Sequence, residues 1–141
     1  FVWFDNCNSC HSFCSLNSKK KMIKLSKSPI STKKFRVVFK DGIVIDFGAR
    51  GYSDYTIHKN PLRMRRYVGR HGGKLPKYLK NEKDPKVVHQ KMLEITKSYK
   101  EDWSKRGIKT AGFWSRWLLW SFPTLREAKK FMKKKFRLHI V

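Results

Sequence analysis

The chain has 141 residues, with 34 Lys and Arg against 10 Asp and Glu, which gives a formal net charge of +24. This length supports one domain and excludes a multidomain enzyme, and no apolar run reaches the ~18 residues that a membrane span needs. Hydrophobic residues make up 40% of the chain and aromatic residues 14%, so it is not simply a disordered basic tail. The composition predicts a small, folded, strongly basic domain with an anionic neighbour.

Residues 1–34 are predicted to be a leader and polar linker, or an extended arm, in front of a basic domain over residues 35–141. Residues 1–21 show no helical or strand period and lack the features of a secretory signal. They are either translated upstream of a true start at Met22 or a tail that docks on a partner. Residues 24–34 are rich in Lys and Ser, which is typical of a connector.

All three cysteines lie in the leader, and three chemical hypotheses fit them. Cys7, Cys10 and His11 match the C-x-x-C-H pattern of covalent haem attachment, but nothing around them resembles a cytochrome. Adding Cys14 gives a weak zinc candidate, because the adjacent Cys10 and His11 reach one tetrahedral ion with difficulty. We prefer the third hypothesis, a reduced intracellular protein with no cofactor and no metal.

A β-hairpin is predicted over residues 35–47, where β-branched and aromatic residues surround Asp41-Gly42. A two-residue turn would mix the two faces of the hairpin. A three-residue loop with Gly42 left-handed instead pairs Phe39 with Ile43 and sets Arg36 opposite Asp46, and we choose this register. It gathers six apolar residues on one face: Phe35, Val37, Phe39, Ile43, Ile45 and Phe47.

Helices are predicted to cover this face. Capping signals open helices at Asn60-Pro61, Asp84-Pro85, Thr110 and Thr124, and glycines end the first two at Gly72-Gly73 and Gly107. The second helix is expected to be long, because four apolar residues follow a helical period: Val88, Met92, Ile95 and Tyr99. Residues 136–141 alternate as a strand that would join the hairpin. The expected fold class is α+β, a hairpin or three-stranded sheet covered by three to four helices.

Two basic blocks are the candidate contact surface for a polyanion or an acidic partner. Eight Lys and Arg lie between His58 and Lys80 without an acid, and seven between Thr124 and Arg137 face only Glu127. The contact residues that we predict are His58, Lys59, Arg63, Arg65, Arg66, Arg70, Lys74, Lys129, Lys130, Lys133, Lys134 and Lys135.

The segment GYSDYTIHKNP, residues 51–61, is rich in turn-forming residues. We predict a scaffold in which Tyr52, Tyr55 and His58 pack under the next helix. The alternative is a phosphate site made by His58, Lys59, Arg63 and the N-terminus of that helix.

The segment TAGFWSRWLLW, residues 110–120, holds three tryptophans in eight residues. The neighbouring leucines favour a buried core over a platform for unpaired bases. Arg116 either stacks on tryptophan rings or pairs with Asp54. The predicted motif core from both segments comprises Tyr52, Asp54, Tyr55, Phe113, Trp114, Arg116, Trp117 and Trp120.

These two segments and RRYVGRH, residues 65–71, resemble a family of small basic proteins of unknown function from nucleocytoplasmic large DNA viruses, including chlorella viruses, mimiviruses and iridoviruses. The resemblance runs from about Phe35 to the C-terminus, and this chain departs from it by a helical insert at about 72–107 and by the leader. It implies a virus-encoded, non-membrane protein packaged in the particle and no established enzyme activity.

Two functions follow as hypotheses. The first is a non-enzymatic structural protein of the virion, a minor capsid or cement component in contact with other capsid proteins, including the major capsid protein, or with the acidic headgroups of an internal membrane. It would pass through the host cytoplasm or virus factory during assembly. The second is a sequence-nonspecific protein that neutralises or packages viral DNA. A basic nuclease using Asp54, His58 and Arg66 is disfavoured, because clustered carboxylates for metal ions are missing from the sequence.

Overall fold

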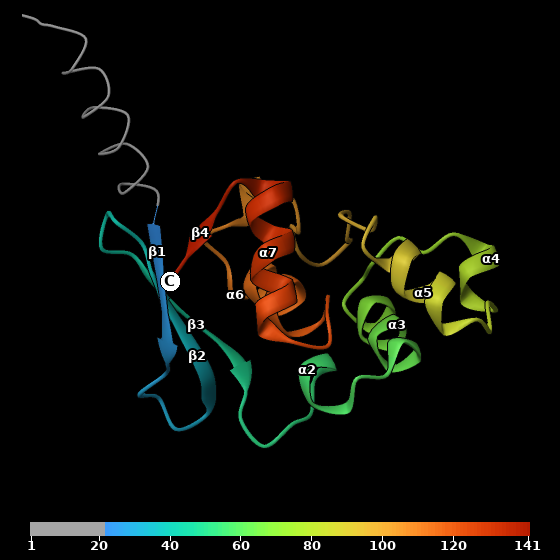
Figure 1. The fold of residues 1–141 in the computed structure, drawn as a ribbon, viewed down its shortest axis with the longest axis horizontal. Helices are drawn as coiled ribbons and strands as arrows, with labels where there is room; N and C mark the ends of the chain where they lie inside the picture. The colour runs from blue at the N-terminus through green and yellow to red at the C-terminus, as the bar shows by residue number, and fades with distance from the viewer. Residues whose placement is uncertain (1–21) are drawn as a thin grey trace, which may run out of the picture.

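A four-stranded mixed sheet lies at one end of the protein in the computed structural model, which describes residues 22–141 (Figure 1). Its strands are β1 (Met22–Lys27), β2 (Lys33–Val38), β3 (Val44–Ala49) and β4 (His139–Ile140), in the order β3-β2-β1-β4. The pairs β1–β2 and β2–β3 are antiparallel, and β4 is parallel to β1. The α+β fold class is therefore confirmed, with one strand more than predicted.

The predicted hairpin register is confirmed. Arg36 lies opposite Asp46, and the backbone N–H of Phe39 donates to the carbonyl of Ile43 at 2.9 Å. Gly42 has a φ of +92°, a left-handed conformation that glycine adopts without strain. Ile43 at the end of the hairpin is exposed rather than part of the apolar face.

The prediction of a connector over 24–34 is wrong at both ends, because residues 22–27 form β1 and β2 begins at Lys33. In β1, Ile23 is buried and Leu25 is half-buried, while Lys24 and Ser26 are exposed. This alternation is typical of an amphipathic strand, but the high Lys and Ser content hid it. The C-terminal strand joins the sheet, but β1 lies between it and the hairpin, so β4 pairs with β1 and not with the hairpin as predicted.

Two helical layers extend from the sheet (Figure 1). Near the sheet lie α6 (Ala111–Trp114), the π-helical segment η2 (Ser115–Leu119) and α7 (Leu125–Phe136). Farther along lie α2 (Tyr55–His58), α3 (Pro61–Arg70), α4 (Lys77–Lys80) and α5 (Pro85–Met92), and a short 3-10 turn, η1 (Lys105–Gly107), precedes α6. The predicted caps are present at Asn60, Asp84, Thr110 and Thr124, where each side chain accepts a backbone N–H.

The predicted long helix after Asp84 ends at Met92. Beyond it, the backbone of Lys97 accepts the N–H of Lys74 at 3.0 Å, and the N–H of Tyr99 donates to Gly72 at 2.8 Å. These pairings replace further helical turns, and they leave Tyr99 exposed to 80% instead of buried. The insert is therefore tied to the end of α3 by backbone hydrogen bonds.

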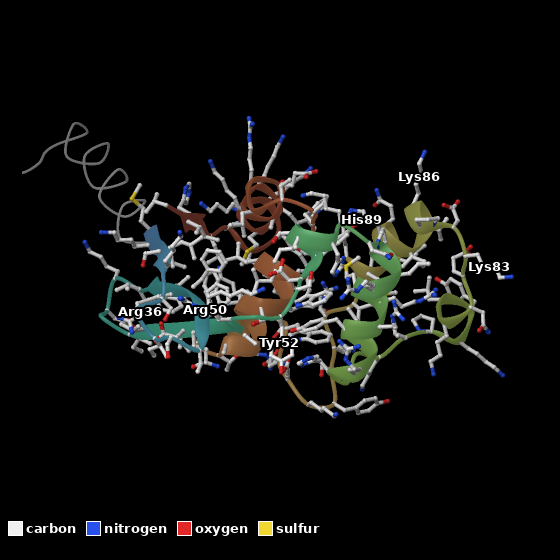
Figure 2. All side chains as sticks on the ribbon, turned by 90° about the horizontal axis from the view of Figure 1, so that it is seen from below. Arg36, Arg50, Tyr52, Lys83, Lys86 and His89 are labelled. Carbon is white, nitrogen blue, oxygen red and sulfur yellow. The ribbon has the colours of Figure 1, made fainter. Side chains whose placement is uncertain are left out.

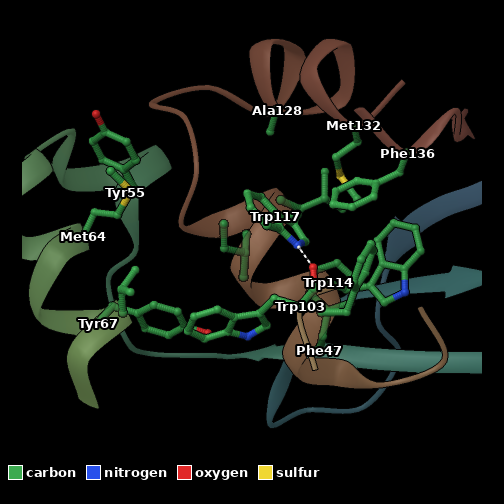
Figure 3. Close-up of a cluster of buried hydrophobic side chains, with 14 of the residues drawn as sticks. Phe47, Tyr55, Met64, Tyr67, Trp103, Trp114, Trp117, Ala128, Met132 and Phe136 are labelled. Atoms are coloured by element: carbon green, nitrogen blue, oxygen red, sulfur yellow. Dashed lines mark hydrogen bonds between the residues drawn. The ribbon is translucent and has the colours of Figure 1, made fainter. Parts of the chain in front are cut away.

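The tryptophan segment lies in the core, as predicted, where it contributes Phe113, Trp114, Trp117, Leu118 and Leu119, while Trp120 is half-buried at the edge of the core (Figure 3). Trp114 and Trp117 are fully buried, and so is Trp103, which the periodicity did not single out. The indole N–H of Trp117 donates to the carbonyl of Trp103 at 2.8 Å, and that of Trp114 donates to Ile108 at 2.7 Å. The indole rings of Trp114 and Trp117 are thus buried with their N–H groups hydrogen-bonded, which stabilises a single packed arrangement.

Candidate anion-binding surfaces

The outer face of α3 carries three of the predicted contact residues. Arg63, Arg66 and Arg70 are exposed, because Met64, Tyr67 and Val68 occupy the buried stripe of the helix. Asn60 caps the helix by accepting the N–H of Leu62 at 2.9 Å. None of the three arginines forms an ion pair with any residue in 22–141. α3 thus presents unneutralised guanidinium groups to solvent.

The second surface is the outer face of α7, which we call the α7 lysine face. Lys130, Lys133, Lys134 and Lys135 are exposed and Lys129 is half-buried, while Ala128, Met132 and Phe136 point to the core. Within the described part of the chain, no carboxylate pairs with these lysines. Glu127, the acid of this helix, donates its backbone N–H to the hydroxyl of Thr124 at 3.2 Å, as the predicted capping box requires, and its carboxylate accepts that hydroxyl at 2.8 Å.

Other predicted contact residues are engaged inside the fold. Arg65 donates to the carbonyls of Leu79 at 2.8 Å and Glu82 at 2.6 Å, so it fastens the insert to α3. Lys59 donates to the carbonyl of Pro123 at 2.6 Å. Lys74 is exposed and lies 4.7 Å above the ring of Tyr99. Arg65 and Lys59 therefore hold parts of the fold together through backbone carbonyls.

His58, the histidine of the first motif, also contacts other residues of the fold. His58 Nδ1 accepts the backbone N–H of Asn60 at 2.9 Å, and its ring packs 5.3 Å from that of Trp120. Burial lowers the pKa of His58, and the nearby Arg63 lowers it further. Because Lys59 donates to Pro123 as well, these contacts favour the scaffold interpretation over a phosphate site of His58, Lys59 and Arg63.

The two sequence motifs meet in a cleft of about 410 Å³, which we call the motif cleft. It opens between the start of β2, the end of β3, the loop before α2, one side of α3, α6 and η2. Its wall includes a parallel stack in which Tyr67 and Trp120 lie 4.4 Å apart at 5°. The ring of His71 stacks on that of Tyr67 at 4.1 Å. The residues that carry charge or aromatic rings in the motif cleft are Lys33, Lys34, Tyr52, Asp54, Arg63, Tyr67, Arg70, His71, Glu101 and Trp120.

Tyr52 does not pack under α3 as predicted, because its side chain is 74% exposed at the rim of the motif cleft (Figure 2). Gly51 before it has a φ of +92°, and this turn places Tyr52 on the surface. Asp54 and Tyr55 are buried, as predicted. The motif therefore supplies two core residues and one exposed ring.

Both carboxylates of the motif cleft already have partners. Asp54 accepts Lys34 Nζ at 2.5 Å and the N–H of Thr56 at 2.9 Å, which caps α2. Glu101 lies 3.1 Å from His71 Nδ1 and accepts the indole N–H of Trp103 at 2.7 Å. Three cations that line the motif cleft form no ion pair with any residue in 22–141: Lys33, Arg63 and Arg70. The motif cleft is thus positive on balance.

Arg116 is fully buried behind the motif cleft. Its guanidinium carbon lies 4.4 Å from the ring centroid of Trp117, so the stacking alternative is confirmed and the Asp54 pairing is wrong. It donates to the carbonyl of Trp120 at 2.7 Å and to that of Met92, while Nε has no partner. Burial lowers the pKa of Arg116 to about 10, which leaves it charged at neutral pH.

The nuclease candidates do not form a metal site. Asp54 is occupied by Lys34 and Thr56, and no group of three or more His, Cys, Asp or Glu in residues 22–141 is arranged to hold a metal ion. The weak metal candidates Cys7, Cys10, His11 and Cys14 lie outside the described residues. No helix within 22–141 combines the length and apolar character of a bilayer span.

Two partly buried histidines predict a pH-dependent stability. Burial lowers the pKa of His58 and of His89 below the ordinary 6.5, and His89 Nδ1 lies 2.9 Å from the hydroxyl of Tyr55. Burial raises the pKa of Tyr55 to about 12, so its hydroxyl stays protonated and shares a hydrogen bond with the ring of His89. Unfolded histidines bind protons that the folded ones exclude, so the free energy of unfolding should fall as pH drops through about 6.5.

Urea unfolding at about pH 7.5 and about pH 5.5 measures this dependence. The His58→Gln/His89→Gln variant should lose most of the difference between the two pH values, because the carboxylates with lowered pKa titrate below this window. If the variant shows the same difference in unfolding free energy between the two pH values, groups other than His58 and His89 cause the pH dependence.

Sequence reasoning missed Lys33 and Glu101 as parts of the motif cleft, because both lie outside the two motifs and only the folded backbone brings them to the cleft.

The comparison with family models covers the first motif. Residues 23–71, from β1 to the end of α3, match the model of DUF5754, a family of unknown function. No curated protein and no solved structure matches the chain. Residues 23–71, about two fifths of the described residues, are thus similar to a family of unknown function.

Proposed function

We propose that the protein is a non-enzymatic structural component of a large DNA virus particle, a minor capsid or cement protein beneath the capsid shell. The viral setting comes from the resemblance of its motifs. The contact chemistry comes from its surface: five ion pairs are present in residues 22–141, and they use few of its many cations. The unneutralised cations of α3 and the α7 lysine face are the observation that carries the proposal.

The rigidity of these surfaces supports the role of a structural component over that of a flexible polycation. α3 and α7 each bury an apolar stripe, so their charged faces are fixed relative to the core. Fixed cations suit neighbours whose acidic groups are themselves fixed, such as other capsid proteins, including the major capsid protein, or an ordered layer of acidic lipid headgroups. The protein would then be located in the virion, after assembly in the host cytoplasm or virus factory.

Particles emptied of DNA provide the test. We expect the protein to remain with the shells at a constant ratio to the major capsid protein, while a genome-bound control protein leaves with the DNA. Quantitative mass spectrometry of both fractions measures the ratio. Release of the protein together with the genome would overturn the structural role.

Sequence-nonspecific DNA binding is the second candidate, and the α7 lysine face favours it. Its exposed lysines lie on one helix of 12 residues without a paired acid, which suits contacts to successive phosphates. Binding to random-sequence duplex should then weaken steeply with salt, with a log–log slope that falls by about 0.9 for each lysine contact removed.

The Lys130→Gln/Lys133→Gln/Lys134→Gln variant tests that slope against a matched variant, Lys77→Gln/Lys80→Gln/Lys83→Gln, which removes equal charge from the insert. A lower slope in the α7 variant alone supports DNA contact through this face. Weak binding with little salt dependence in the unmodified protein would contradict DNA binding.

A further inference from the structure

We propose that the motif cleft binds a nucleoside phosphate, either as a free nucleotide or as an unpaired nucleotide of a nucleic-acid strand. This inference concerns one concave site and does not rest on the structural role in the particle. The cleft volume of about 410 Å³ lies within the usual range of small-molecule sites. Its cations and exposed aromatic ring match the two halves of such a ligand.

The phosphate end of the ligand fits the cations of the motif cleft. Arg63 and Arg70 are seven residues apart on α3, so they lie on one face of the helix about two turns apart. Lys33 reaches the same cleft from β2. Because none of these three groups has a carboxylate partner in the described residues, a phosphate gains their charge without breaking an existing ion pair.

Arg116 adds positive potential from behind the wall of the cleft. It is completely buried, it has no carboxylate partner in residues 22–141, and it donates to the carbonyl of Trp120, whose side chain lines the cleft. A buried charge is screened less than an exposed one, so it acts over a longer distance. An anion in the motif cleft would offset a charge that the fold leaves without a counterion.

The base end of the ligand fits Tyr52. This ring is 74% exposed at the rim, within the same cleft as Arg63 and Arg70, and no aromatic partner stacks on it within the described chain. An exposed aromatic ring beside arginines is suited to stack on a base while the arginines hold its phosphate. The Tyr67–Trp120 stack behind it fixes the wall, so the site is already formed.

Fluorescence anisotropy with two probes tests the proposal: a fluorescent nucleoside triphosphate and a fluorescein-labelled short oligodeoxythymidylate, each competed with inorganic phosphate. Binding of both probes indicates a mononucleotide site, and binding of the oligodeoxythymidylate alone indicates an unpaired strand. Inorganic phosphate should compete only weakly, because it lacks the base. Failure of both probes to bind would overturn the proposal.

Matched variants separate this site from the general charge of the protein. We expect Arg63→Gln/Arg70→Gln to weaken binding at least about tenfold, and Lys130→Gln/Lys133→Gln, which removes the same charge from α7, to weaken it less than about threefold. Equal losses in the two variants would show that only surface charge is involved and would overturn the proposal.

Tyr52 has its own control. Tyr52→Ala should weaken binding about tenfold and Tyr52→Phe should preserve it, because stacking needs the ring and not the hydroxyl. Tyr78→Ala removes a comparably exposed ring from α4, outside the cleft, and should have no effect. Unchanged binding in Tyr52→Ala would show that this ring does not contact the base, which contradicts the proposal. Near-ultraviolet circular dichroism establishes that each variant is folded.

Discussion

Arg116→Ala is expected to lower the free energy of unfolding by about 3–5 kcal/mol. The substitution removes a completely buried side chain that stacks on Trp117 and leaves the carbonyls of Met92 and Trp120 without their charged donor. Those carbonyls belong to the end of α5 and to the end of η2, so Arg116 joins the insert to the tryptophan segment. Relief from burying an unpaired charge offsets part of the loss.

Urea unfolding of Arg116→Ala, Arg116→Lys and Arg116→Met measures these contributions. Lysine keeps the charge but cannot serve both carbonyls with a planar fork, and methionine fills the space without a charge. We expect both variants to be more stable than Arg116→Ala and less stable than the unmodified protein. A change of less than about 1 kcal/mol in Arg116→Ala would show that the buried guanidinium does not hold these elements together.

Trp117→Ala is expected to have an equally large effect, about 3–5 kcal/mol. Its ring is fully buried and packs 5.4 Å from Phe136 of α7 and 5.6 Å from Phe131. The substitution also leaves the carbonyl of Trp103 without the indole donor that reaches it at 2.8 Å. Loss of this ring therefore loosens the packing of α7 on η2 and leaves a cavity between them.

Thermal and urea unfolding of Trp117→Ala test this, with Trp117→Phe as the conservative control that retains most of the packing. Because Arg116 stacks on Trp117, the double variant Arg116→Ala/Trp117→Ala should be less destabilised than the sum of the single variants. Additive losses would contradict a direct interaction between the two side chains. A stable Trp117→Ala protein would contradict the assignment of Trp117 to the core.

Local signals in the sequence predicted the elements whose causes are local. Asp41-Gly42 determined the hairpin register, and Asn60-Pro61 and Thr124 to Glu127 marked helix starts, because each signal is a hydrogen bond or a backbone preference within a few residues. The tryptophan segment was correctly assigned to the core from its composition. Its density of large apolar rings has no other stable location in a small domain.

Features that depend on distant backbone were not predictable from one sequence. The helix after Asp84 stops at Met92 because residues 97–99 pair with residues 72–74, and the apolar period alone does not show this. Arg116 is bound to carbonyl oxygens, which every residue possesses, so no residue type marks its partners. Residues 22–27 had too few apolar positions to identify β1 without its partners β2 and β4.

The candidate surfaces were partly predictable. The exposure of Arg63, Arg66 and Arg70 on α3 and of Lys130, Lys133, Lys134 and Lys135 on α7 followed from charge and helical period, whereas Arg65 is bound to backbone carbonyls of the insert and Lys129 is half-buried. The motif cleft was not foreseen, because it forms where two motifs some 50 residues apart in the sequence meet Lys33 and Glu101. The exposure of Tyr52 follows from the turn at Gly51, which sequence reasoning had interpreted as part of a buried scaffold.

The central claim is that a rigid basic domain contacts fixed anionic neighbours in a virus particle, and a high-resolution density map of the intact particle tests it most directly. We predict that the fold of residues 22–141 occupies symmetric positions beneath the shell, with Arg63, Arg66 and the α7 lysine face against acidic side chains or lipid headgroups. Absence of this fold from the ordered shell, with the protein recovered only in the genome fraction, would contradict the claim.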